Sequence, residues 1–157
     1  MLPLHTILCS TDWSELSYAA LEVAGEWADH FGAALYLLHV VKPLENPGLL
    51  LSSEQIEESM RADAEQQLFQ VLRERVPTIP SARALVATGN PAAEIAKVAA
   101  RENADLLIIA THGQSHWHHI SSGVLMDRIG FGSVAAGVVQ LVECPVLTVR
   151  GPPVVAT

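Results

Sequence analysis

Residues 34–41 read ALYLLHVV, a nearly continuous run of apolar side chains. A strand with one face in water alternates apolar and polar residues, whereas a strand covered on both faces is apolar throughout. Residues 105–110 read DLLIIA and have the same character after the first position. These two runs predict a parallel sheet with helices packed on both of its faces.

Strand and helix patterns alternate through the rest of the chain. Further strands are expected at residues 4–9, 82–88 and 146–149. Apolar residues at three- and four-residue steps predict helices between the strands. For the first helix this spacing predicts a core face of Leu16, Ala20, Val23, Trp27 and Phe31.

Capping signals mark where the later helices begin. Ser52 and Gln55 fit a capping box for the second helix. Asn90 is expected to cap the third, and the last is expected over residues 133–142. The predicted core face of the second helix comprises Ile56, Met60, Ala64, Leu68, Val71 and Leu72.

The order of these elements defines the fold class. Five strands that alternate with four helices indicate an α/β protein with an open five-stranded parallel sheet, helices on both faces and a Rossmann-like arrangement. With 157 residues in total, residues 1–150 are expected to form a single domain and residues 151–157 a tail.

Composition excludes several functional classes. The chain has 17 acidic and 9 basic residues, a net charge of −8, and no cluster of Lys and Arg that could neutralise nucleic-acid phosphates. No stretch approaches the roughly 20 apolar residues of a membrane-spanning helix, and no signal peptide is recognised. We therefore expect a cytoplasmic protein that binds neither nucleic acid nor membrane. Cys9 and Cys144 are too few for a disulfide scaffold and fit small core residues.

Ligands of open parallel sheets bind beyond the carboxyl ends of the strands. Gly132 and Ser133 open the last helix there, and the free N–H groups of a helix start can bind an anion, although the same pair fits a plain helix start. Gly113 would provide a second turn whose backbone N–H groups can face a phosphate. Alternatively, it only supplies a turn with positive φ. Asp12 fits either hydrogen bonds from a ribose or an adenine amine, or a cap on the next helix.

Seven short motifs, taken in order, resemble the universal stress protein family over almost the whole chain. They begin with residues 7–14 (ILCSTDWS) and 37–41 (LLHVV), and end with the strand motif CPVLTV at residues 144–149. The motifs between them are 89–92 (GNPA), 104–109 (ADLLII), 111–113 (THG) and 132–134 (GSV).

The resemblance implies a stress-response module that acts as a homodimer through its last strand and binds ATP or AMP, leaving open whether Mg²⁺ accompanies the nucleotide. The ATP-binding branch of the family carries a G-x2-G-x9-G-[ST] motif, whose positions fall on Ala110, Gly113, Gly132 and Ser133. The implied nucleotide-binding residues are Thr11, Asp12, Val40, Ile109, Ala110, Gly113, Gly132, Ser133 and Val134.

Two departures from that motif support a different function. Ala110 replaces a glycine, and 18 residues rather than nine separate Gly113 from Gly132, so that residues 114–131 contain an insertion. The insertion could cover a nucleotide or obstruct its site. The alternative is therefore an interaction protein of the same fold that binds no nucleotide.

The segment 111–132, which contains the insertion, is also rich in histidine. Imidazoles bind zinc and nickel, which makes a metal-responsive protein a further alternative, but their spacing fits no established ligand pattern and we predict no metal site. The candidate ligands would be His112, His116, His118 and His119. No nucleophile stands beside a base and no carboxylates are paired, so we expect no enzyme, with weak ATP hydrolysis left open.

Overall fold

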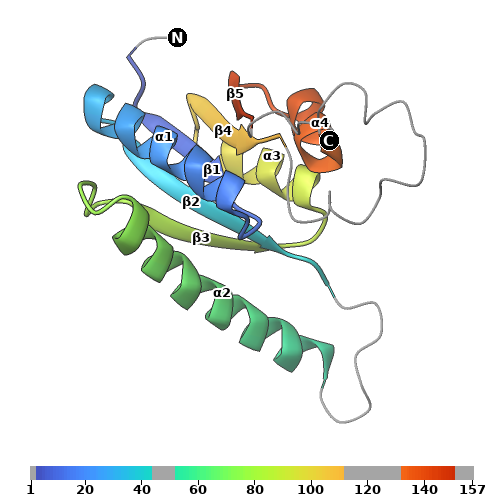
Figure 1. The fold of residues 1–157 in the computed structure, drawn as a ribbon. Coiled ribbons are helices and arrows are strands. Elements are labelled where there is room, and N and C mark those ends of the chain that lie inside the picture. Colours follow the sequence, from blue (N-terminus) through green and yellow to red (C-terminus); the bar gives the residue numbers. More distant parts are fainter. Residues whose placement is uncertain (1–2, 44–51, 112–131, 151–157) are drawn as a thin grey trace, which may run out of the picture.

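The computed structural model describes residues 3–43, 52–111 and 132–150, and its centre is a five-stranded parallel sheet (Figure 1). The strand order is β3-β2-β1-β4-β5, which confirms the predicted fold class. Each predicted strand is present, with boundaries shifted by two residues at most. The strands are β1 (Thr6–Ser10), β2 (Ala34–Val41), β3 (Arg83–Thr88), β4 (Leu106–Ala110) and β5 (Val146–Val149).

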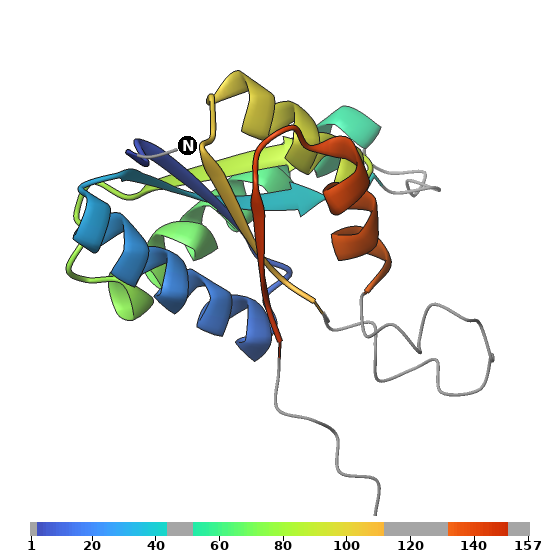
Figure 2. The same ribbon diagram turned by 90° about the horizontal axis from the view of Figure 1, so that it is seen from above.

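Helices cover both faces of the sheet, as the apolar runs of β2 and β4 predict. Two helices pack with one apolar core on one face, and the other two pack with a second core on the opposite face (Figure 2). The first pair is α1 (Glu15–Phe31) and α2 (Ser53–Arg75), and the second pair is α3 (Pro91–Arg101) and α4 (Ser133–Leu141). No helix in the described ranges is long and apolar enough to cross a membrane.

The helix starts follow the capping signals of the sequence. Ser52 and Gln55 form the predicted capping box of α2, in which each side chain accepts the other residue's backbone N–H. The Asn90 side chain accepts the N–H of Ala93 and caps α3, with Pro91 in the first turn. Both helices therefore begin at the residues that the capping signals predict.

The predicted core face of α1 is partly wrong. Trp27 and Phe31 are 38% and 39% exposed and lie outside the core. The buried face is built from smaller side chains at three- and four-residue steps, which bring the helix close to its neighbours. A Cβ on Gly25 would lie only 2.5 Å from Val76 Cγ1. The buried residues of α1 are Ser17, Ala20, Leu21, Ala24, Gly25 and Ala28.

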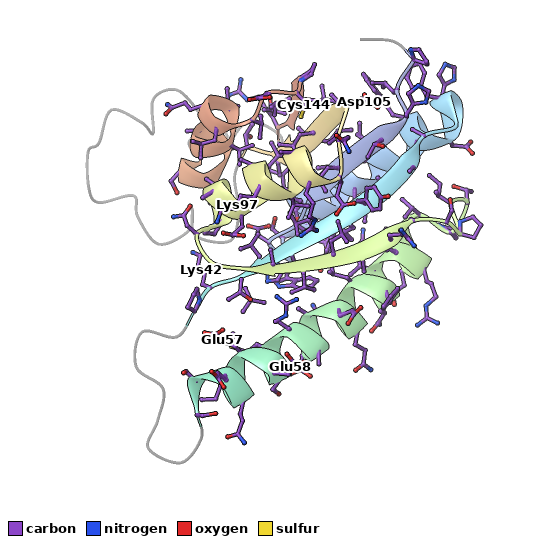
Figure 3. All side chains as sticks on the ribbon, turned by 180° about the vertical axis from the view of Figure 1, so that it is seen from behind. Lys42, Glu57, Glu58, Lys97, Asp105 and Cys144 are labelled. Atoms are coloured by element: carbon purple, nitrogen blue, oxygen red, sulfur yellow. The ribbon has the colours of Figure 1, made fainter. Side chains whose placement is uncertain are left out.

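At the amino end of the sheet, Asp105, which directly precedes β4, is bonded to the start of β1. Its carboxylate accepts the backbone N–H groups of His5 and Thr6 at 2.8 and 2.9 Å, and these bonds lower the pKa of that carboxyl. The labelled side chains of Asp105 and Lys42 lie at opposite ends of the sheet (Figure 3). Asp105 therefore stabilises the end that lies away from the candidate site.

Candidate functional site

A cavity of about 300 Å³ opens at the carboxyl edge of the sheet, bordered by β1, β2 and β4 and by the starts of α3 and α4. The chain runs from β1 outward to β2 and β3 on one side and to β4 and β5 on the other, so this is the switch in strand order where such folds bind ligands. The predicted site residues that line the cavity are Thr11, Asp12, Val40, Ile109, Ala110, Gly132, Ser133 and Val134.

The remaining candidates lie outside the described residues. Gly113, the other predicted nucleotide contact, belongs to the undescribed range 112–131. The same range contains the four histidines considered as metal ligands, His112, His116, His118 and His119. In the described part of the chain, no group of three His, Cys, Asp or Glu side chains is arranged to hold a metal ion.

The loop between β1 and α1 places Asp12 on the wall of the cavity. Ser14, not Asp12, is the residue that caps α1, because its hydroxyl accepts the N–H of Ser17 at 3.1 Å. Asp12 supports this cap from outside, since its Oδ1 accepts both the N–H and the hydroxyl of Ser14. Of the two roles considered for Asp12, the direct helix cap is therefore excluded.

Thr11 anchors the same loop to the sheet. Its N–H donates to the carbonyl of Leu38 at 2.9 Å, which extends the β1–β2 pairing by one residue. Its buried hydroxyl lies 2.7 Å from the Ser17 hydroxyl. The Ser17 hydroxyl donates to the Ser14 carbonyl at 2.8 Å, so Thr11 Oγ1 is the donor to Ser17 when that bond forms. These bonds join the end of β1 to the first turn of α1.

His39 and Trp13 complete this wall of the cavity. The Trp13 indole N–H donates to His39 Nε2 at 3.2 Å, and the two ring centroids are 4.3 Å apart. Because Nε2 accepts, the ring proton is on Nδ1, which lies 2.9 Å from the Thr11 carbonyl and donates to it. Burial lowers the pKa of His39, and the Thr11 bond and the Asp12 charge oppose that effect.

Val40 offers main-chain groups to the cavity. The pairing of β1 with β2 ends where Ser10 faces Leu38, and Val40 lies two residues further along β2. In a strand, residues two apart direct their N–H and C=O groups to the same side. The Leu38 carbonyl points toward β1, so the N–H and C=O of Val40 point to the space that β1 has left.

On the opposite wall, α4 begins at the cavity. The N–H of Gly132 donates to the carbonyl of Thr111, which ties the helix start to the end of β4. Gly132 has φ −66° and ψ 156°, a conformation open to any residue, and no side chain caps the helix. The backbone conformation therefore does not require glycine here, and the first N–H groups of α4 lie at the cavity without a side-chain cap.

Comparison with known proteins identifies the family. The sequence pattern of the universal stress protein family matches residues 3–150. A universal stress protein of Methanocaldococcus jannaschii is 30% identical over 148 residues, which cover 93% of this chain and 82% of the relative. The chain belongs to the universal stress protein family.

Solved universal stress proteins share the fold. The protein UspA from Lactobacillus plantarum has a TM-score of 0.77 and 22% identity, with 96% of this chain and 100% of that chain covered. A universal stress protein crystallised with cAMP has a TM-score of 0.64, 22% identity and coverage of 94% and 97%. One from Archaeoglobus fulgidus crystallised with dAMP has a TM-score of 0.56, 19% identity and coverage of 95% and 99%.

Several residues that line the cavity of this universal stress protein were not among the predicted contacts. Four of them lie at or just after the carboxyl ends of strands or at the helix start that follows, where the fold class predicts a ligand site: Ser10, Lys42, Pro91 and Thr111. Ser17 lies inside the first turn of α1 and carries no signal in the sequence beyond its polarity. The other unpredicted lining residues are Leu38, His39, Ile95 and Ala135.

Proposed function

We propose that this universal stress protein binds an adenine nucleotide, ATP or AMP, in the cavity at the carboxyl edge of the sheet and acts as a homodimeric stress-response module. The observation that carries the proposal is the convergence of three kinds of group on one cavity: the carboxylate of Asp12, the main chain of Val40 and the start of α4. Two relatives of the same fold were crystallised with cAMP and dAMP, which supports an adenine nucleotide as the ligand.

The main chain of Val40 suits the base. Adenine presents a ring-nitrogen acceptor beside its amino donor. A peptide N–H and C=O on one side of a strand offer the complementary donor and acceptor. Apolar side chains of Ile95 and Ile109 also line the cavity and would contact the ring faces.

Asp12 suits the sugar, because a carboxylate accepts hydrogen bonds and a ribose has hydroxyls to donate. The start of α4 suits the phosphate, since its first N–H groups carry the positive end of the helix dipole. A cavity of about 300 Å³ falls at the small end of the range of about 300–1,000 Å³ for small-molecule sites, which favours a mononucleotide.

The first experiment is a calorimetric titration of the full chain with AMP and with ATP, preceded by native mass spectrometry of undialysed protein. Gly132→Val puts a branched side chain beside the N–H groups of α4 and should abolish binding without loss of the dimer. Gln140→Val introduces the same residue on the exposed side of α4 and serves as the control. Unchanged affinity in Gly132→Val would reject this site.

The proposed dimer forms through the outer edge of β5, which no other strand of the described residues pairs with. The carbonyls of Pro145 and Val149 accept N–H groups of Leu107 and Thr111, so odd positions of β5 face β4. Val146 and Thr148 therefore direct their main-chain groups to the open side. An apolar edge strand with unpaired groups is a template for a second strand, here that of a second copy.

Thr148→Pro tests the dimer, because it removes an outward N–H and leaves the pairing with β4 in place. Sedimentation should show a monomer, whereas Thr148→Val retains the N–H and should remain dimeric. A monomeric unaltered chain at micromolar concentration would contradict the proposal.

We propose binding rather than dedicated catalysis as the role of the cavity. The hydroxyls of Ser14 and Ser17 are both engaged in the start of α1, which leaves them poorly placed as nucleophiles. Incubation of the purified dimer with ATP should release phosphate slowly or not at all. Sustained turnover that Gly132→Val abolishes would contradict this part of the proposal.

One observation favours the alternative of a nucleotide-free interaction protein. Ala110 lines the cavity and puts a methyl group where the ATP-binding motif of the family has a glycine. The same titration separates the two functions, because a dimer that takes up neither AMP nor ATP supports the alternative. In that case Ala110→Gly should restore nucleotide binding if the methyl group is the obstacle.

A further inference from the structure

Trp13 has a backbone conformation that large residues rarely adopt. Its φ is 70°, in the left-handed region that favours glycine, and it directly follows Asp12. A bulky residue persists in this conformation only where surrounding contacts hold it. The contacts of Trp13 therefore show how the backbone of the loop between β1 and α1 is held in place.

Those contacts are three hydrogen bonds that link Thr11, Trp13 and His39 to one another. The Trp13 N–H donates to Thr11 Oγ1 at 3.0 Å, and its indole N–H donates to His39 at 3.2 Å. His39 in turn bonds the Thr11 carbonyl at 2.9 Å. Asp12 lies between Thr11 and Trp13, so the main chain is anchored on both sides of it.

We infer that Trp13 and His39 are a positioning pair for the ligand site: they fix the direction in which Asp12 meets the ligand, and the affinity for nucleotide depends on them. This inference rests on the proposed nucleotide function and names residues that act through Asp12. His39 also lines the cavity, so the pair connects the ligand with the loop directly.

If Trp13 and His39 only filled space in the fold, their hydrogen bonds would not matter for nucleotide affinity. Any aromatic ring at position 13 could cover the half-buried His39, and the direction of the ring hydrogen bonds would be immaterial. The positioning role requires instead that an indole donor meet a ring acceptor and that the other ring nitrogen donate to Thr11. Conservative variants that remove one of these bonds at a time distinguish the two roles.

Three variants separate the bonds. Trp13→Phe retains an aromatic ring and removes the indole donor. His39→Asn keeps an amide near the Nδ1 position to donate to Thr11 and removes the acceptor, whereas His39→Gln keeps a group near the Nε2 position. Trp27→Phe, which changes an exposed aromatic residue of α1, is the matched control.

The measurement is the affinity for AMP by calorimetry, together with the urea midpoint of each variant. Trp13→Phe and His39→Asn should weaken AMP binding about tenfold or more while unfolding remains cooperative, and His39→Gln should recover part of the loss. Trp27→Phe should bind AMP as the unaltered chain does. AMP affinities of Trp13→Phe and His39→Asn within about twofold of the unaltered value would overturn the positioning pair and leave the proposed function intact.

A spectroscopic readout tests the same inference without relying on stability. In a chain with Trp27→Phe and Trp117→Phe, Trp13 is the remaining tryptophan. Its emission should shift when AMP is added, because the ligand acts on the indole through His39, and the shift should be lost with His39→Asn. An emission spectrum that AMP leaves unchanged would contradict the pair. An unaltered chain that binds neither AMP nor ATP would overturn the proposed function and the pair together.

Discussion

Gly137 of α4 faces Ala92 of α3 so closely that a Cβ at position 137 would lie 2.9 Å from the Ala92 Cβ. Both residues belong to the helix pair that covers the cavity side of the sheet, where Pro91 and Ala135 line the cavity. Because Gly137 has no side chain, α4 can lie close to α3 beside the cavity.

Gly137→Ala should destabilise the fold although alanine is the better helix former. The helix preference favours alanine by about 1 kcal/mol, whereas forcing a methyl group into a packed contact costs about 1–3 kcal/mol. Adding Ala92→Gly should restore stability, because the double variant exchanges the two residues and cancels the helix terms. Urea unfolding of all four chains gives a coupling energy, which should exceed about 1 kcal/mol. If the changes in unfolding free energy of the two single variants simply add in the double variant, α3 and α4 move apart at no cost and the contact is unimportant.

Gly89 and Gly32 should respond differently to alanine. Both have positive φ, 144° and 64°, but a Cβ on Gly89 would lie 2.9 Å from Glu94 Cγ, whereas Gly32 has nothing within 4 Å. Gly32→Ala should cost about 1–2 kcal/mol for the left-handed backbone alone. Gly89→Ala should cost more, since it also displaces Glu94 from Lys97, which lies 2.6 Å away. Equal losses in urea unfolding would mean that the Glu94 side chain moves without cost.

The sheet could be predicted from sequence because β2 and β4 are apolar on both faces, a pattern that only covered parallel strands require. The core face of α1 could not, because the spacing of large residues pointed to Trp27 and Phe31. The contact is made instead by small residues, and Gly25 lies so close to Val76 that a side chain at this position would not fit without a shift. Periodicity reports where apolar residues recur, and it does not report how near the neighbouring helix comes.

The candidate site could be predicted in outline for a geometric reason. Parallel strands end at one edge, so residues after β1, β2 and β4 had to meet there. The roles of His39 and Ser17 could not be foreseen, because their bonds to Thr11 depend on how a loop folds back over the sheet. The left-handed backbone of Trp13 has no signal in the sequence either, since glycine is the residue expected at such a φ.

Acid should weaken the fold through Asp105. Two backbone N–H bonds hold the pKa of this carboxyl below its ordinary value of 3.8, so its contribution to stability is present above that pH and is lost as the pH falls through the lowered pKa. Asp105→Asn should lower the free energy of unfolding at neutral pH by about 1 kcal/mol. The difference between the two chains should shrink in acid below pH 3.8. A difference that stays constant with pH would show that charge is immaterial to these bonds.

His39 should impose a second pH dependence at milder acidity. Burial lowers its pKa below the ordinary 6.5, with the Thr11 bond and the nearby Asp12 carboxylate acting in the opposite direction. The neutral ring therefore contributes stability that is full above pH 6.5 and is lost as the pH falls through the lowered pKa. Protonation at Nε2 also leaves the Trp13 indole facing a second donor, so that bond breaks.

Urea unfolding from about pH 8 to pH 5 compares the unaltered chain with His39→Gln, which cannot titrate at this position. The stability advantage of histidine should be constant above pH 6.5 and decline below it. The difference between the two chains isolates the contribution of position 39. An advantage that persists unchanged to pH 5 would mean that the imidazolium is accommodated, and that the Trp13 bond does not depend on the neutral ring.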